Sequence, residues 1–100
     1  MDFLPIFINL RGQPCLVVGG GEVAMRKAAL LQEAGAKVRV VSPELTASLR
    51  QQAADGVIDY RQGNFEPSDL DGIALIIAAT DDTEVNRQVS ELAKARQLPV

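Results

Sequence analysis

Short apolar runs alternate with longer mixed stretches along this 100-residue chain, and each run is long enough to form one strand. The runs at 15–18 and 73–79 are continuously apolar, which is typical of strands buried on both faces of a parallel sheet. The strands predicted in this way cover residues 5–10, 15–18, 37–41, 57–60 and 73–79, with one more beginning at 98–100.

Apolar residues at helical spacing lie between these strands. A first helix is predicted over residues 22–34, ending before Gly35, a residue that commonly follows a helix. Residues 62–71 are rich in turn-forming residues and leave room for one short helical turn. The side chains of the first helix expected to face the sheet are Val23, the stem of Lys27, Leu30, Leu31 and Ala34.

Two later helices are predicted from their start signals. Ser42 as N-cap and Pro43 at the first helical position indicate a helix that runs to about residue 54. Asp81 and Glu84 fit a capping box at the start of the last helix. The inner face of that helix is expected to carry Val85, Val89, Leu92 and Ala93.

Alternating strands and helices predict a parallel sheet with right-handed crossovers and helices on both faces. We therefore expect an α/β fold of the Rossmann-like NAD(P)-binding type, with one mononucleotide-binding half present. The expected organisation is a single domain over residues 1–100, truncated at its C-terminal end and belonging to a longer chain.

Composition narrows the possible functions. The net charge is −3 and the isoelectric point is near 4.8, so the basic footprint of nucleic-acid-binding proteins is absent. No apolar run approaches the about 20 residues that span a bilayer, and no signal peptide is recognisable. We expect a cytoplasmic protein that binds neither nucleic acid nor membrane.

The cysteine and histidine content excludes several kinds of chemistry. Cys15 is the only cysteine, so no internal disulfide forms and a reducing compartment is favoured. Because Cys15 begins an apolar run, we expect a buried packing residue rather than a reactive thiol. The chain contains no histidine, which excludes a Ser–His–Asp triad and histidine ligation within it, and we predict no metal site.

The most informative motif is the glycine turn after the strand at 15–18. It fits G-x-G-x-x-A, with Gly19 at the bend, Gly21 where backbone approaches a pyrophosphate, and Ala24 where the helix packs on the sheet. The following helix offers free N–H groups and the positive end of its dipole to an anion. Within a strand–turn–helix–strand unit, this motif predicts dinucleotide binding.

Two more segments are expected beside the glycine turn, because ligands of such sheets bind beyond the carboxyl ends of the strands. Ser42 and Glu44 follow the second parallel strand, where they contact the adenosine ribose or cap the next helix. No arginine directly follows that strand to bind a 2′-phosphate, which favours NAD over NADP. Thr80, Asp81 and Asp82 follow the last strand, either as a carboxylate pair or as helix caps.

Three other polar side chains have two possible roles each. Asn86 lies one turn into the last helix and faces either the site or solvent. Arg26 and Lys27 either meet an anionic substrate or remain solvated on the first helix. The sequence does not decide between these roles.

Three blocks of sequence, taken in order, resemble one family across essentially the whole chain. The first block is Leu4 to Phe7 with Leu10. The second is the G-G-G-E-V-A-M-R-K run of 19–27 with the segments 30–31, 35–36 and 38–43, and the third is A-A-T-D-D of 78–82 with Val85 and Asn86. In these blocks the chain resembles the N-terminal domain of siroheme synthase, the precorrin-2 dehydrogenase/sirohydrochlorin ferrochelatase family.

The resemblance implies an activity and its partners. Members of this family use NAD⁺ to remove two hydrogens from precorrin-2, giving sirohydrochlorin, and many insert Fe²⁺ to give siroheme. They work as homodimers, and the fused bacterial form carries a C-terminal methyltransferase. The competing hypothesis is a non-catalytic NAD(H)-sensing regulatory module, which is expected to carry an acidic ribose ligand after its second strand and to lack the A-A-T-D-D block.

The resemblance also implies roles for individual residues. It implies that the cofactor diphosphate contacts Gly19, Gly20, Gly21, Glu22 and Val23. It implies that the adenosine half lies along Ser42, Pro43 and Glu44, and the other half near Thr80 and Asp81. The family's catalytic aspartate is expected beyond Val100, so no catalytic residue is assigned and residues 1–100 alone are expected to be inactive.

Overall fold

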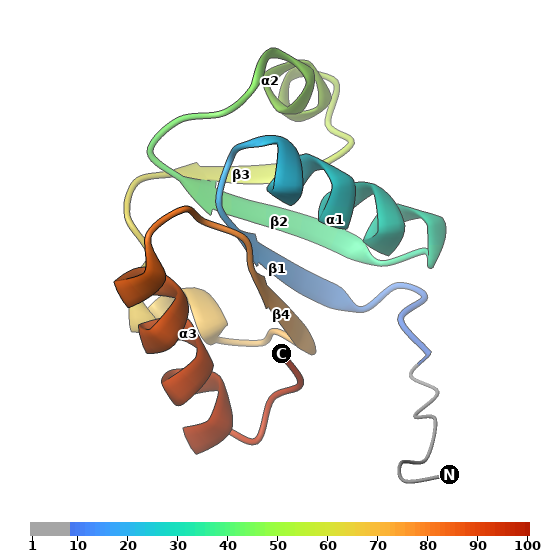
Figure 1. The fold of residues 1–100 in the computed structure, drawn as a ribbon. Coiled ribbons are helices and arrows are strands. Elements are labelled where there is room, and N and C mark those ends of the chain that lie inside the picture. The colour runs from blue at the N-terminus through green and yellow to red at the C-terminus, as the bar shows by residue number, and fades with distance from the viewer. Residues whose placement is uncertain (1–8) are drawn as a thin grey trace, which may run out of the picture.

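The computed structural model describes residues 9–100, which form a four-stranded parallel sheet with helices (Figure 1). The strand order is β3-β2-β1-β4, which confirms the predicted parallel α/β architecture. The strands are β1 (Pro14–Val18), β2 (Lys37–Ser42), β3 (Asp59–Gln62) and β4 (Leu75–Ala78). The helices are α1 (Glu22–Glu33), α2 (Ala47–Ala54), the 3-10 helix η1 (Pro67–Leu70) and α3 (Thr83–Ala95).

Helices cover both faces of the sheet (Figure 1). Successive side chains of a strand point to opposite faces, so β1 contributes to two hydrophobic clusters. Val17 packs with Leu49 of α2 and the inner residues of α1. Leu16 packs on the other face with Val89 of α3 and Leu70 of η1. The interior strand is thereby buried on both sides, as its continuous apolar sequence predicts.

The face of α1 that packs on the sheet differs from the prediction. The buried residues are Ala24, Ala28 and Leu31, whereas Val23 and Leu30 are 46% and 60% exposed. Small side chains allow the helix backbone to approach the sheet, and the branched residues of the strands fill the space between them. Of the predicted inward-facing residues, only Leu31 is buried; Val23, Lys27, Leu30 and Ala34 are exposed.

The start of α2 was also predicted wrongly. Ser42 ends β2, and the N-cap of α2 is Thr46, whose hydroxyl accepts a hydrogen bond from Leu49 N at 3.3 Å. The Ser42 hydroxyl accepts instead from Glu44 N at 3.4 Å. The segment between them is held against the glycine turn by the bond from Thr46 N to Gly20 O, at 2.8 Å.

The N-cap of the last helix lies one residue later than predicted. Asp82, not Asp81, is the N-cap, and its carboxylate accepts from Glu84 N and Val85 N at 2.9 and 3.2 Å. The predicted inner face is confirmed, because Val89 and Ala93 are buried on the sheet. Val85 and Leu92 are partly buried beside them.

Several predicted strand limits shift. β3 begins two residues late, because the N–H groups of residues 57 and 58 donate to Gln52 O and complete the end of α2. β4 spans only the middle of the predicted 73–79 run. The strand predicted at 5–10 falls mainly outside the described residues, and Asn9 and Leu10 are not in a strand. The segment 98–100 is irregular, although Pro99 O accepts from Ile76 N of β4 at 3.1 Å.

No helix within residues 9–100 has the length and hydrophobicity needed to cross a membrane. The same residues contain no group of three or more carboxylate or thiol side chains arranged to hold a metal ion.

Cys15 is fully buried in β1, and burial raises the pKa of its thiol. We expect Cys15→Ser to lower the free energy of unfolding by about 1–3 kcal/mol, because the hydroxyl would be buried among apolar side chains. Urea denaturation measures this loss, with Cys15→Ala as the control that adds no polar group. Dinucleotide affinity should not change, because residue 15 lies near the N-terminal end of β1 and the glycine turn follows its C-terminal end. A folded Cys15→Ser protein that loses the cofactor would contradict the packing role.

Candidate nucleotide-binding site

The carboxyl edge of the sheet brings together the three segments predicted from the sequence. These are the glycine turn after β1, the segment 42–44 at the end of β2, and the segment 79–82 after β4. A fourth segment, residues 63–65 after β3, joins them and was not predicted. Each lies there because parallel strands all end at one edge.

Gly19 makes the bend at which β1 ends. Its φ is +133°, which L side chains rarely adopt, and a Cβ atom there would lie 2.4 Å from Ala79 O. Its N–H donates to Val41 O of β2 at 2.9 Å. The turn is thus fixed against the ends of both neighbouring strands.

Gly20 is required by the close approach of two loops. A Cβ atom at this position would lie 1.8 Å from Glu44 O and 2.7 Å from the Ser42 hydroxyl. The Gly20 carbonyl also accepts the hydrogen bond from Thr46 N. The sequence motif did not indicate this role, since G-x-G-x-x-A leaves the second position free.

Gly21 faces open space. It is exposed, and a Cβ atom there would meet no atom within 4 Å. Gly21 is the N-cap of α1 and supplies no side-chain cap, so the first N–H groups of the helix are free for an anion. Glu22 and Val23, which carry these groups, are also exposed.

The loop after β4 is held by Asn86. Its amide oxygen accepts from the Thr80 hydroxyl at 2.9 Å and from Thr80 N at 3.3 Å, and its amide nitrogen donates to Thr80 O at 2.9 Å. The side-chain amide of partly buried Asn86 is therefore directed at Thr80 and fixes this loop. The carboxylate of Asp82 is used as a helix cap, which supports capping over the carboxylate-pair interpretation.

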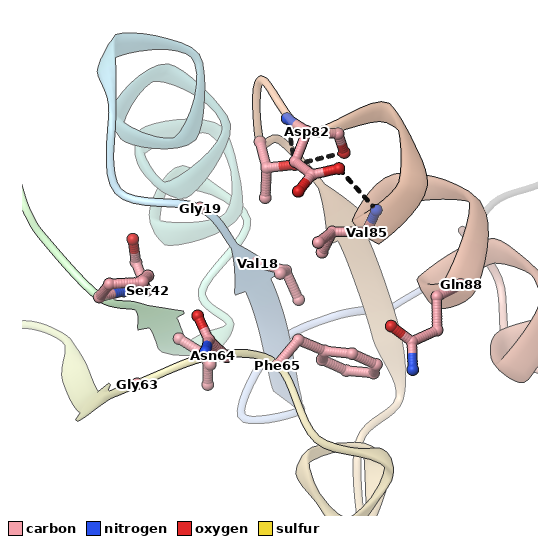
Figure 2. A pocket seen from close by; sticks show the side chains of 12 residues that line it. Val18, Gly19, Ser42, Gly63, Asn64, Phe65, Asp82, Val85 and Gln88 are labelled. Carbon is pink, nitrogen blue, oxygen red and sulfur yellow. Dashed lines mark hydrogen bonds between the residues drawn. The ribbon is translucent and has the colours of Figure 1, made fainter.

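Two cavities flank the contact between Gly19 and the β4–α3 loop. The first, of about 280 Å³, lies between the ends of β1, β2 and β3 and the start of α3 (Figure 2). Asp82 and Val85 lie across it from Asn64 and Phe65. Among residues 9–100, no basic side chain lines it. Its lining comprises Val18, Gly19, Val41, Ser42, Pro43, Gly63, Asn64, Phe65, Thr80, Asp82, Val85 and Gln88.

The second cavity, of about 300 Å³, opens beside the N-terminus of α1. Thr80 lines both cavities and so stands between them. Within the part of the chain that the structure describes, Arg26 is the one cationic side chain in the lining of this cavity, with the exposed carboxylates of Glu22 and Asp81 beside it. The lining comprises Gly21, Glu22, Val23, Arg26, Ala79, Thr80 and Asp81.

The predicted site residues are divided between these cavities. Gly19, Ser42 and Pro43 line the first, while Gly21, Glu22, Val23 and Asp81 line the second. Glu44 lines neither, and borders a separate hollow near Arg50 and Tyr60. Asn64, Phe65 and Gln88 were missed, and the only sequence signal for the first two was their place directly after a strand.

The sequence profile of a family described as putative NAD(P)-binding matches residues 6–100. The chain belongs to this family. Membership in this family and the solved-structure match described below confirm the Rossmann-like fold and support the expected nicotinamide dinucleotide cofactor.

Individual proteins that are similar to this chain support the same family assignment. The chain is 59% identical over 100 residues to a siroheme synthase of Methylobacillus flagellatus and 53% identical to one of Chromobacterium violaceum. It is covered completely in both alignments but spans only 21% of either relative. A solved structure of SirC, precorrin-2 dehydrogenase, matches 88% of this chain and 44% of its own, with a TM-score of 0.80 and 31% identity. The resemblance to siroheme synthase is thereby confirmed.

The residues of this NAD(P)-binding chain fit a dinucleotide. Gly21 leaves room for a diphosphate beside free N–H groups, and no side chain competes for them. A cavity lies on either side of the glycine turn, as two nucleoside halves require.

Proposed function

We propose that this chain is the NAD-binding part of a precorrin-2 dehydrogenase that acts in siroheme biosynthesis. The observation that carries the proposal is the open Gly21 position, which exposes the N-terminus of α1 between two cavities at the carboxyl edge of the sheet. The high identity to siroheme synthases supports the choice of substrate.

In this proposal the diphosphate binds the backbone of Gly21, Glu22 and Val23. The adenosine half occupies the first cavity, with Ser42 and Pro43 at its edge. The nicotinamide half lies in the second cavity, and the remaining predicted contacts, Gly19, Gly20, Glu44, Thr80 and Asp81, border or support these three places.

Bound NAD⁺ supplies the hydride acceptor for precorrin-2, and the second hydrogen leaves as a proton. The residues of this chain bind and orient the dinucleotide. Asn86 fixes the Thr80 loop against which the reactive half lies, so that half is held in one orientation. The proton acceptor is assigned to no residue among 1–100.

The other properties proposed for the intact protein rest on the family resemblance. They are a chain longer than this single domain, homodimer formation, a cytoplasmic location and insertion of Fe²⁺ as a second substrate into sirohydrochlorin. An NAD(H)-sensing module is the weaker hypothesis, because β2 ends in Ser42 where such a module is expected to carry an acidic ribose ligand.

Calorimetric titration of this chain with NAD⁺ and, separately, NADP⁺ tests the proposal. We expect saturable binding that favours NAD⁺, because no basic side chain lines the first cavity to meet a 2′-phosphate. Circular dichroism first verifies folding. A folded chain that binds neither dinucleotide would contradict the proposed site, and assay of precorrin-2 oxidation by the intact protein then tests the activity separately.

A further inference from the structure

An ion pair between a buried carboxylate and a partly exposed guanidinium lies beside the loop that forms one wall of the first cavity. Asp69 of η1 is 6% exposed, and Arg61 of β3 approaches it with two nitrogens. Arg61 Nε donates to one carboxylate oxygen at 2.6 Å, and Nη2 donates to the other. Such bidentate pairs fix geometry more tightly than single contacts do. The cavity lining contains neither residue, so the pair does not itself contact a bound ligand.

The pair holds the segment between its two members. This segment, residues 63–66, is the β3–η1 loop. Arg61 Nη2 donates to Asn64 O at 2.8 Å, and Asp69 accepts from Glu66 N at 2.8 Å. Gly63 N donates to Ser42 O at 3.1 Å, which ties the loop to the end of β2. Both ends of the loop are therefore fixed.

The two residues so placed form one side of the cavity. Asn64 and Phe65 lie across the cavity from Asp82 and Val85 (Figure 2). The loop has no regular secondary structure of its own. Its conformation is set by the hydrogen bonds at its ends and by the packing of Phe65 against the hydrophobic cluster around Leu16.

The electrostatics favour a pair that is charged at neutral pH. Burial acts to raise the pKa of Asp69, but the hydrogen bonds from Arg61 and from Glu66 N outweigh it and lower the pKa overall. The carboxylate is therefore ionised at neutral pH. A buried carboxylate is costly unless it is paired, so losing Arg61 would release Asp69 and the loop together.

We propose that Arg61 and Asp69 are positioning residues for the adenosine half of the cofactor, which act by fixing Asn64 and Phe65 as the wall of the first cavity. The inference rests on the proposed function, since it takes the adenosine half to bind there. It predicts that breaking the pair weakens every ligand that carries adenosine, because the loop must then be ordered on binding.

The test compares three variants of this chain with the wild type. Asp69→Asn removes the charge at nearly constant volume, and Arg61→Lys keeps the charge but loses the bidentate geometry. Asp59→Asn is the matched control, because it breaks the exposed pair between Arg39 of β2 and Asp59 of β3. Calorimetry measures the Kd of NAD⁺ and of AMP, and hydrogen–deuterium exchange follows the amides of the β3–η1 loop.

In each pair variant we expect the Kd of NAD⁺ and the Kd of AMP to rise by the same factor, about tenfold. We also expect faster hydrogen–deuterium exchange at the amides of the β3–η1 loop. The control should stay within about twofold. If the pair has a purely structural role, Asp69→Asn and Arg61→Lys will lower only the melting temperature and leave both Kd values unchanged below that temperature. This result would overturn the inference. So would a loss of NAD⁺ affinity without a loss for AMP, or a wild type that binds NAD⁺ but not AMP.

A wild type that binds no NAD⁺ would instead contradict the proposed function. The exchange measurement still separates the two cases, because it reports whether the pair fixes the loop without any ligand. Unchanged exchange in a folded Asp69→Asn protein would overturn the inference by itself.

Discussion

Replacing Gly21 by aspartate is expected to abolish NAD⁺ binding while leaving the protein folded. The new side chain enters open space, so nothing in the fold is displaced. Aspartate is a favoured N-cap, and its carboxylate would accept the free N–H groups of the first turn of α1. The proposed diphosphate site would lose its donors and gain a negative charge, which we expect to raise the Kd at least about a hundredfold.

Calorimetry measures the affinity of the variant for NAD⁺, and urea denaturation measures its free energy of unfolding. Gly21→Asp should be as stable as the wild type or slightly more stable, because α1 would gain a side-chain N-cap that the glycine does not provide. Gly21→Ala is the control for the added carbon, and should lose far less affinity than the aspartate variant. Unchanged affinity in folded Gly21→Asp would refute the assignment of the diphosphate site.

Gly20→Ala should produce the opposite pattern. An added Cβ atom would overlap Glu44 O at 1.8 Å, and that oxygen belongs to backbone rather than to a flexible side chain. We expect a loss of about 3 kcal/mol in the free energy of unfolding, because the two loops must separate and the bond from Thr46 N to Gly20 O is disturbed.

Thermal and urea denaturation of Gly20→Ala beside Gly21→Ala make this a matched comparison. The two variants add the same atom one residue apart, so their difference reports the local space alone. Equal stability of the two would show that the loops do not pack as closely as described. Adjacent glycines of one motif are thus expected to separate into a stability position and a binding position.

The parts of the fold that periodicity controls could be predicted from the sequence. Continuous apolar runs located β1 and β4, and the glycine turn located the start of α1. Helix starts were less predictable, because Ser42 and Thr46 are both good caps and the choice depends on a contact with Gly20. The sequence around Ser42 and Thr46 does not indicate the hydrogen bond from Thr46 N to Gly20 O, because Gly20 is distant in the chain.

The same limit applies to the site. Gly19 and Gly21 follow from a motif whose geometry is local, and the structure gives them the expected surroundings. Asn64 and Phe65 lie at the cavity because β3 lies beside β2 and Phe65 packs on the core, and in our inference because Arg61 pairs with Asp69. Contacts across eight positions of chain leave no periodic signal.

The single thiol of Cys15 gives this protein a built-in reporter of its own opening. It is 0% exposed and lies in the strand bonded to both β2 and β4, so a thiol reagent reaches it only when the centre of the sheet comes apart. The rate of alkylation under native conditions therefore tracks the unfolded population without any engineered label. A ligand that binds only the folded protein slows that rate in proportion to its occupancy. Cofactor affinity can thus be read from the protection of one sulfur atom.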